Sequence, residues 1–281
     1  MPDIRIYQIY YDLTKQPPLD PGFIPYDNTA NKRPEWFELG PMLDFLNRTT
    51  LEPDAWYGFV SARFQSKTGW TSSDVLRGVS AISDKADVAL LTPGWDQLAY
   101  FRSVFENGEF WHPGFINALS GFLEHEGIDL DPRTMVTHSL SSCFSNYVVA
   151  RPAYWREWQK IAQRFFEYAE GDDALNAPTP YFRGPAVMKG FVQERLMAVV
   201  LAQNQFRVAS RLPPPSHLIG RYFPRNAETA KLLQTCDRMK QLYAAKGDPV
   251  HLQAYLDARQ RITFSAPPRH PDSENLNTTG K

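Results

Sequence analysis

The 281-residue chain is poor in cysteine and has neither an excess of one charge nor a long apolar run. Only Cys143 and Cys236 are present, too few for a disulfide framework or a zinc ligand set, which suits a reducing compartment. Thirty basic and 31 acidic residues leave a net charge of -1, with no electrostatic footprint for nucleic acid or an anionic membrane. No run approaches the roughly 18 apolar residues of a membrane span, and the first residues lack the pattern of a signal peptide. We therefore expect a cytoplasmic protein with no transmembrane segment and no nucleic-acid partner.

The residues that are present suit a large folded core. Hydrophobic residues make up 43% of the chain, and aromatic residues make up 14%. A chain of this length and composition can bury a large core as one α/β domain or as two closely joined ones. Aromatic side chains fill cores, but they also line clefts that bind sugars and bases, so their number alone selects no function.

Short runs rich in β-forming residues alternate with longer runs of helical periodicity. We expect strands at residues 4–11, 55–64, 87–91, 143–150 and 206–209. We expect helices at residues 36–46, 72–82, 95–106, 113–126, 152–169, 185–204, 227–246 and 250–262. This order predicts an α/β fold with an open, mostly parallel or mixed sheet, helices on both faces and a helical C-terminal part.

The same pattern predicts one domain over residues 1–264, with a helical extension from about residue 212. Residues 265–281 are polar and proline-rich, and we expect them to be disordered. The long segment 17–33 contains several apolar residues, so we expect it to be ordered against the body. Ligands of open α/β sheets bind at the carboxyl ends of the strands, which places the segments after Tyr11, Phe64 and Leu91 at the mouth of any cleft.

The stretch from Pro185 to Asn204 predicts a helix that is apolar almost all round. Such a helix is usually buried, so Glu194 and Arg195 are charges at positions where burial is costly without a partner. Glu194 is therefore a candidate site residue. The alternative is that Glu194 pairs with an arginine and only holds the core together.

The run after the second expected strand combines two cations with hydroxyl side chains: Ser61-Ala-Arg-Phe-Gln-Ser-Lys-Thr-Gly69. Arg63 and Lys67 suit a phosphate or diphosphate, and Thr68 adds a hydroxyl. The run lacks the frame of a Walker A loop. Solvated cations on a surface loop are the ordinary alternative.

His112 precedes Pro113 where a helix is expected to begin, and imidazole is a natural acid or base near neutral pH. A capping or core histidine is the alternative. Asp84 and Asp87 are weak metal candidates just before a strand, and no cluster has convincing metal-ligand spacing. No Gly-x-Ser-x-Gly elbow supports a serine nucleophile.

Three stretches together resemble bacterial sugar-nucleotide glycosyltransferases of the GT-A type. They are the first strand Ile6-Tyr-Gln-Ile-Tyr-Tyr-Asp12, the junction Ser145-Asn-Tyr-Val-Val-Ala-Arg-Pro-Ala-Tyr-Trp155, and Gly190-Phe-Val-Gln-Glu-Arg-Leu196. The last is similar to a helix of surface-polysaccharide transferase-like proteins.

The resemblance implies a cleft for a nucleotide-sugar donor, with a glycan as acceptor. Tyr7, Gln8 and Tyr10 would lie near the nucleotide. Arg63 and Lys67 would lie near the diphosphate, with Thr68 beside them. Glu194 would lie near the acceptor as a base or an orienting group, and His112 is a second catalytic candidate.

No Asp-x-Asp follows a central strand, so Mn²⁺ or Mg²⁺ dependence and a metal-independent mechanism both remain open. Without a metal, arginine and lysine would have to neutralise the leaving diphosphate. We therefore expect a glycosyltransferase that moves a sugar from a nucleotide diphosphate to a glycan. The alternatives are a non-catalytic glycan- or nucleotide-binding protein and a glycoside hydrolase that pairs Glu194 with an aspartate of residues 84–87.

Overall fold

A six-stranded mixed sheet forms the centre of the protein, in a computed structural model that describes residues 2–12, 14, 17–31, 33–179 and 186–266. The strand order is β2-β1-β3-β5-β4-β8. The strands are β1 (Ile4–Tyr10), β2 (Ile24–Asp27), β3 (Trp56–Ser61), β4 (Val88–Leu91), β5 (Val148–Ala150) and β8 (Val208–Arg211). A separate pair joins β6 (Pro178–Thr179) to β7 (Ala186–Val187).

Only β5 runs against the other strands of the six-stranded sheet, since it pairs antiparallel with both β3 and β4. The β1–β2, β1–β3 and β4–β8 pairs are parallel. The carboxyl ends of five strands and the amino end of β5 therefore meet at one edge, which we call the carboxyl edge. The predicted open, mostly parallel or mixed sheet is confirmed.

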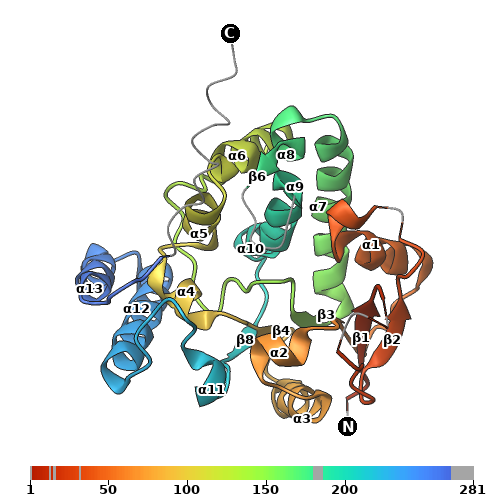
Figure 1. Ribbon diagram of the computed structural model, residues 1–281, viewed down its shortest axis with the longest axis horizontal. Helices are drawn as coiled ribbons and strands as arrows, with labels where there is room; N and C mark the ends of the chain where they lie inside the picture. Colours follow the sequence, from red (N-terminus) through yellow and green to blue (C-terminus); the bar gives the residue numbers. More distant parts are fainter. Residues whose placement is uncertain (1, 13, 15–16, 32, 180–185, 267–281) are drawn as a thin grey trace.

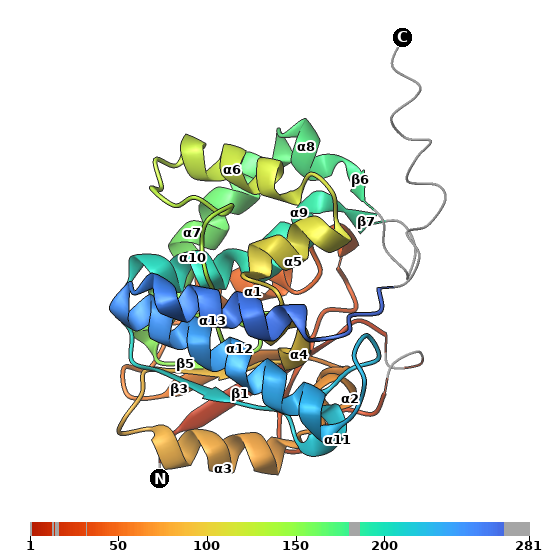
Figure 2. The same cartoon turned by 90° about the vertical axis from the view of Figure 1, so that its left-hand side faces the viewer.

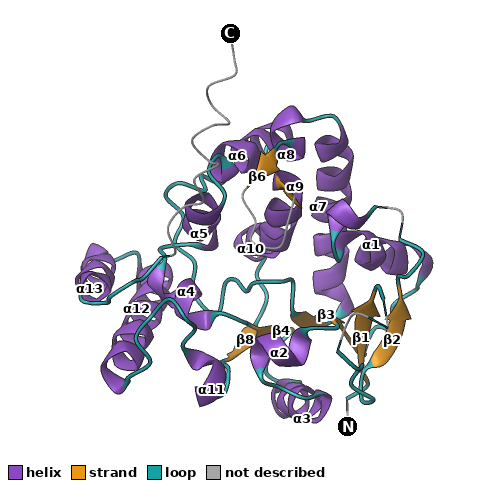
Figure 3. Ribbon diagram, viewed as in Figure 1, coloured by secondary structure: helices purple, strands orange, loops and turns teal. Residues whose placement is uncertain are grey.

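Helices cover both faces of this sheet, as Figures 1 and 3 show. One face carries α2 (Phe64–Thr68) and α3 (Ser72–Ile82); the other carries α1 (Leu39–Arg48), α7 (Pro152–Glu170) and α10 (Leu196–Gln203). Alternate residues of β4 reach the two layers: Val88 and Leu90 pack with the α7 side, and Ala89 and Leu91 pack with the α3 side. The helix predicted from residue 152 has the expected buried face, with Trp155 and Trp158 inward.

The C-terminal helices form a hairpin against the side of the sheet domain (Figure 2). It consists of α12 (Ala227–Lys246) and α13 (Pro249–Gln260), and α12 packs on α4 (Trp95–Tyr100). The buried Lys240 Nζ donates to Leu98 O and Phe101 O, each at 2.6 Å. Asp237 accepts hydrogen bonds from the backbone and hydroxyl of Ser139. Buried polar groups thus fasten the predicted helical extension to the domain.

The remaining helices lie mostly on the α7 side. They are η1 (Pro34–Trp36), α5 (Val104–Trp111), α6 (Phe115–His125), α8 (Asp173–Asn176), α9 (Met188–Val192), η2 (Gln193–Arg195) and α11 (Pro215–Leu218). No helix of the described residues is long and apolar enough to cross a membrane. The tail predicted to be disordered falls almost entirely outside the described residues.

Some boundaries differ from the prediction. Of the long segment 17–33, the described residues 17–31 and 33 include the buried Phe23 and contribute β2, an edge strand that tolerates Pro25. The expected helix at 95–106 is divided into α4 and α5, because Ser103 caps a new helix by accepting a bond from Glu106 N. The strand expected at 55–64 ends at Ser61, and residues 64–68 form α2, which ends at Gly69, whose φ is 75°.

The predicted helix 185–204 is interrupted where it carries Glu194. A 3₁₀ turn, η2, separates α9 from α10 and shifts the helical register at that residue. Just before it, Gly190 lets the η1 segment approach closely. A Cβ at Gly190 would lie 2.5 Å from the Phe37 ring and 3.3 Å from Glu35 O. The chain on either side of Phe37 is thereby held against the segment that carries Glu194.

We predict that Gly190→Ala destabilises the protein by roughly 1–3 kcal/mol, because the added methyl group overlaps Phe37 and backbone must shift. Gly40→Ala is the matched control, since nothing lies within 4 Å of its added Cβ and alanine favours the helix. Chemical denaturation should show a lower free energy of unfolding for Gly190→Ala and no decrease for Gly40→Ala. Equal effects would contradict the close approach at Gly190.

Candidate functional site

Lys67 is the centre of a charged cluster at the carboxyl edge of the sheet. It belongs to α2, directly after β3, and is half-buried. Its Nζ donates to Ser145 Oγ at 3.1 Å and lies 5.4 Å from the centre of the Tyr147 ring. Burial alone would lower the pKa of Lys67, but the nearby Tyr147, Glu38 and Glu194 outweigh burial and raise it. The ammonium therefore stays charged at neutral pH.

Glu38 is the first acidic member of this cluster. Burial raises the pKa of Glu38, Lys67 lowers it, and the negative charge of Glu194 raises it again, so that the net shift is upward. Glu38 stands at the beginning of α1, next to Phe37. No hydrogen bond or ion pair joins its carboxylate to another side chain of the described residues. Lys67 therefore offsets only part of the cost of ionising Glu38, and it does so across space rather than by a direct contact.

Glu194, in η2, is the second acidic member. It acts electrostatically on both Glu38 and Lys67. The neighbouring Arg195 makes its hydrogen bonds in the core and not to Glu194. Its buried guanidinium donates to Val104 O, Phe191 O and Asn107 Oδ1 at 2.8–3.0 Å. Burial lowers the pKa of Arg195 to about 10. Under the alternative, Glu194 pairs with an arginine and only holds the core together; among the described residues, no ion pair joins Glu194 to an arginine.

Two tyrosines complete the cluster. The Tyr147 hydroxyl lies 2.6 Å from Ser61 Oγ at the end of β3, and burial raises the pKa of Tyr147 although Lys67 opposes this. Tyr11 follows β1, and burial together with Glu38 raises its pKa as well. Both phenols therefore remain protonated at neutral pH and can donate hydrogen bonds.

The cluster joins the two layers of the protein. Lys67 comes from α2, whose Phe64 packs in the core on the α3 side. Glu38 and Glu194 come from segments that pack in the core on the α7 side. The cation and the carboxylates thus reach the carboxyl edge from opposite faces of the sheet, where open α/β sheets bind ligands.

Backbone strain is concentrated at this cluster. The non-glycine residues of the described chain with left-handed φ are Phe37 (47°), Ser145 (62°) and Asn146 (53°). Phe37 adjoins Glu38, Ser145 contacts Lys67, and Asn146 binds Gln193 beside Glu194. Such conformations cost on the order of 1–3 kcal/mol each and persist where the surrounding structure enforces them, often at functional sites.

Among the residues predicted from sequence, the structure brings Lys67 and Glu194 together. It adds Glu38, Tyr147 and Tyr11, which the sequence interpretation did not single out. Tyr11 is one residue beyond Tyr10, at the predicted cleft mouth. Glu38 carries no local motif, and its segment reaches Glu194 through tertiary packing, with Phe37 against Gly190 and Lys189 over the Trp36 ring.

The three residues expected near a nucleotide make internal contacts. Tyr7 packs on Phe45 with ring centres 4.4 Å apart. The buried Gln8 accepts a bond from Asp20 N at 2.8 Å and orders the segment after β1. Burial and the nearby Asp27 carboxylate raise the pKa of Tyr10. These contacts give each residue a structural role, and none of them places it at the charged cluster.

Arg63 and Thr68, the other two candidates from the run after β3, lie in different surroundings. Arg63 is exposed at the start of α2, beside Lys67 in sequence. Thr68 is fully buried; its hydroxyl donates to Phe64 O at 2.9 Å and accepts from Trp70 N at 3.2 Å. The expectation that Thr68 binds a donor is therefore corrected, because its hydroxyl ends α2.

His112 closes α5 rather than opening a helix. Its ring stacks on Phe191 with centres 3.6 Å apart, and its Nδ1 lies 3.3 Å from Thr179 Oγ1. Phe191 lies in α9, one turn before Glu194. The described contacts of His112 are those of a core histidine, and none reaches the carboxylates of the cluster.

The metal candidates Asp84 and Asp87 lie at the wrong end of the sheet. They precede β4, whose carboxyl end faces the cluster, so they sit at its amino end. Asp87 accepts bonds from Arg207 N and from the Arg207 guanidinium, with the shortest at 2.7 Å. The pairing of Glu194 with an aspartate of residues 84–87 is therefore wrong. The described residues contain no group of three or more His, Cys, Asp or Glu side chains that could hold a metal ion.

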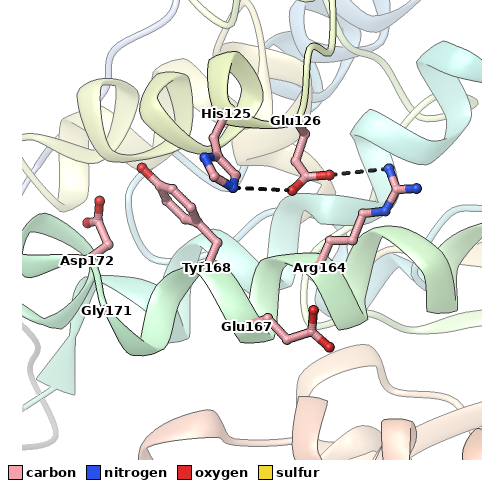
Figure 4. Close-up of a pocket in the computed structure, with 7 residues that line it drawn as sticks. All are labelled: His125, Glu126, Arg164, Glu167, Tyr168, Gly171 and Asp172. Atoms are coloured by element: carbon pink, nitrogen blue, oxygen red, sulfur yellow. Dashed lines mark hydrogen bonds and ion pairs between the residues drawn. The ribbon is translucent and has the colours of Figure 1, made fainter.

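A separate open pocket of about 450 Å³ lies between α6 and α7 (Figure 4). Glu126 in this pocket is paired with Arg164 at 3.2 Å, and the Tyr168 ring packs against His125. It lies on the outer helices, and its Glu126 is neutralised directly by Arg164. The charged cluster around Lys67, in contrast, keeps two carboxylates without direct partners in the described chain, and it is the better candidate site.

Comparison of the chain with protein-family models, curated proteins and solved structures gave no match. The function must therefore be inferred from the site itself.

We predict that Glu38→Gln stabilises the protein at pH 8 but not at pH 4. The raised pKa of Glu38 means that the folded state resists ionisation of this carboxyl group. The wild-type free energy of unfolding is therefore undiminished below the ordinary glutamate pKa of 4.5, and it falls as pH rises through the raised pKa. Melting temperatures of wild type and variant across this range test the prediction. The exposed Glu124→Gln is the control, with no such pH-dependent gain expected. A gain that is the same at both pH values would contradict the assigned environment of Glu38.

Proposed function

We propose that the protein is a glycosyltransferase that moves a sugar from a nucleotide diphosphate to a hydroxyl group of a glycan. The observation that carries this proposal is the charged Lys67 at the carboxyl edge, beside the hydroxyls of Ser145 and Tyr147 and within the field of Glu38 and Glu194. The resemblance of the Gly190–Leu196 stretch to transferase-like proteins supports it. A cytoplasmic location fits, since Cys143 and Cys236 are buried free thiols.

The cluster provides the charges that such a transfer needs. The acceptor oxygen attacks the anomeric carbon as the bond between that carbon and the diphosphate oxygen breaks. The diphosphate leaves with additional negative charge, which the Lys67 ammonium and the neighbouring hydroxyl donors stabilise. The acceptor proton passes to a carboxylate, and Glu194 takes this role or orients the hydroxyl. Lys67 places a cation where the charge develops, and we assign no step to a metal ion.

Glycoside hydrolysis is the second candidate. Its support is the electrostatic coupling of Glu38 and Glu194, with the pKa of Glu38 raised as in a general acid. Cleavage of a glycan without any nucleotide would favour this candidate. Binding of a nucleotide sugar with no transfer and no hydrolysis would instead favour a binding protein.

We predict that nucleotide diphosphates raise the melting temperature of the wild type and that Lys67→Met weakens their binding by about 10- to 100-fold. Removing a charge-assisted contact of this kind costs about 1.5–3 kcal/mol. A thermal-shift and calorimetric screen with UDP, GDP, dTDP and CMP, each with and without Mn²⁺ or Mg²⁺, measures this. At 100 times its dissociation constant a ligand stabilises the protein by ~2.7 kcal/mol. The exposed Lys85→Met is the control, and no binding by wild type would overturn the donor site.

We predict further that Glu194→Gln reduces transfer by about 10²- to 10⁴-fold while the melting temperature stays nearly the same. The amide keeps the shape of the carboxylate but cannot take a proton. Glu124→Gln is again the control for activity. A fall in stability with activity intact would return Glu194 to a purely structural role.

A further inference from the structure

Two buried oxygen atoms next to the charged cluster have no hydrogen-bond partner in the described structure. They are Thr92 Oγ1 and Asn146 Oδ1, in side chains that are 0% and 2% exposed. Leu91 N donates to Tyr147 O at 2.9 Å. Thr92 directly follows Leu91, and Asn146 directly precedes Tyr147. Both residues therefore flank the same hydrogen bond at the carboxyl edge. Each unpaired buried group costs about 1–3 kcal/mol.

The hydrogen-bond network determines which atom of Asn146 is left over. Gln193 Nε2 must face the carbonyl of Gly190, to which it donates at 3.1 Å. Gln193 Oε1 is thereby directed at Asn146 and accepts from Asn146 Nδ2 at 2.8 Å. A reversed Asn146 amide would place two acceptors against each other. The unpaired atom is therefore the acceptor Oδ1, held in place by the residue next to Glu194.

Thr92 supplies the complementary group, since its hydroxyl can donate. The oxygens of Thr92 and Asn146 do not bond one another. The equally buried Thr137 shows the ordinary arrangement, because its Oγ1 accepts from Val104 N at 2.9 Å. The edge of the sheet thus keeps one free donor and one free acceptor beside the strained turn at Ser145 and Asn146.

We propose that Thr92 and Asn146 form a subsite that recognises a hydroxyl group of the transferred sugar, an inference that rests on the proposed transferase function. A sugar hydroxyl accepts from the Thr92 O–H and donates to Asn146 Oδ1 at the same time. A fully ionised phosphate cannot donate to Oδ1, and an ammonium group cannot accept from Thr92. The subsite is therefore selective for the sugar and not for the diphosphate at Lys67.

Both oxygens are covered, so a hydroxyl reaches them only when the turn at Ser145 and Asn146 moves. Both residues have left-handed φ, so the turn that covers the two oxygens is itself strained.

The test compares each nucleotide diphosphate with its sugar: UDP with UDP-glucose, GDP with GDP-mannose, and dTDP with dTDP-glucose. For the pair that binds wild type, the sugar should strengthen binding, and Thr92→Val should reduce this gain by about 2- to 10-fold, the effect of one hydrogen bond. Affinity for the nucleotide alone should stay the same. Asn146→Gly, which tolerates the positive φ, should reduce the same gain.

Stability gives a second readout that needs no ligand. Thr92→Val should leave the melting temperature unchanged or raise it, because it removes an unpaired buried hydroxyl, whereas Thr137→Val should lower it. Equal losses in the two variants would show that Thr92 is satisfied within the protein and would overturn the subsite. An unchanged sugar gain in the variants, or no sugar gain in wild type, would overturn it too while leaving the transferase intact. Absence of all nucleotide binding would instead overturn the proposed function.

Discussion

The electrostatic balance around Lys67 is the interaction on which the site depends. A half-buried ammonium is stable here only because Glu38 and Glu194 compensate the cost of its burial, and the two carboxylates tolerate each other only because Lys67 is present. Each charge comes from a different segment: α2, the start of α1, and η2. The three segments must therefore pack in register before the charges balance. In the described residues no direct ion pair joins Lys67 to either carboxylate, so the three charges act on one another across space.

Local distortions serve this arrangement. The 3₁₀ turn at Gln193–Arg195 separates two adjacent charges, so that Arg195 is satisfied by carbonyl groups of the core while Glu194 joins the cluster. The close approach at Gly190 holds the Glu38 segment in place. Left-handed φ values at Ser145 and Asn146 bring a hydroxyl to Lys67 and an amide to Gln193. These features cost stability individually, and their concentration at one edge is what distinguishes a built site from ordinary packing.

Two buried charges of the C-terminal hairpin have direct partners and illustrate the contrast. Lys240 is more deeply buried than Lys67, yet it donates to two carbonyl oxygens and fastens the C-terminal hairpin. Asp237 accepts from Ser139 and is likewise saturated. Burial of a charge is therefore no sign of function by itself; the absence of direct partners, together with position at the carboxyl edge, is the more informative property.

The sequence by itself determined the fold class and the helices with strong periodicity such as α3 and α7, because periodicity is a local property. It also offered Lys67 and Glu194 as candidates, the first from a run of cations and hydroxyls and the second from the cost of burying a charge. It misplaced Asp84 and Asp87, since it could not tell which end of the sheet they occupy, and it assigned Thr68 to a ligand although that hydroxyl caps its own helix. Glu38, Tyr147 and the subsite at Thr92 and Asn146 depended on tertiary structure alone. Their roles arise from a glycine contact, from strand direction and from a side-chain network between distant segments, and contacts of that kind have no signature within any one stretch of the chain.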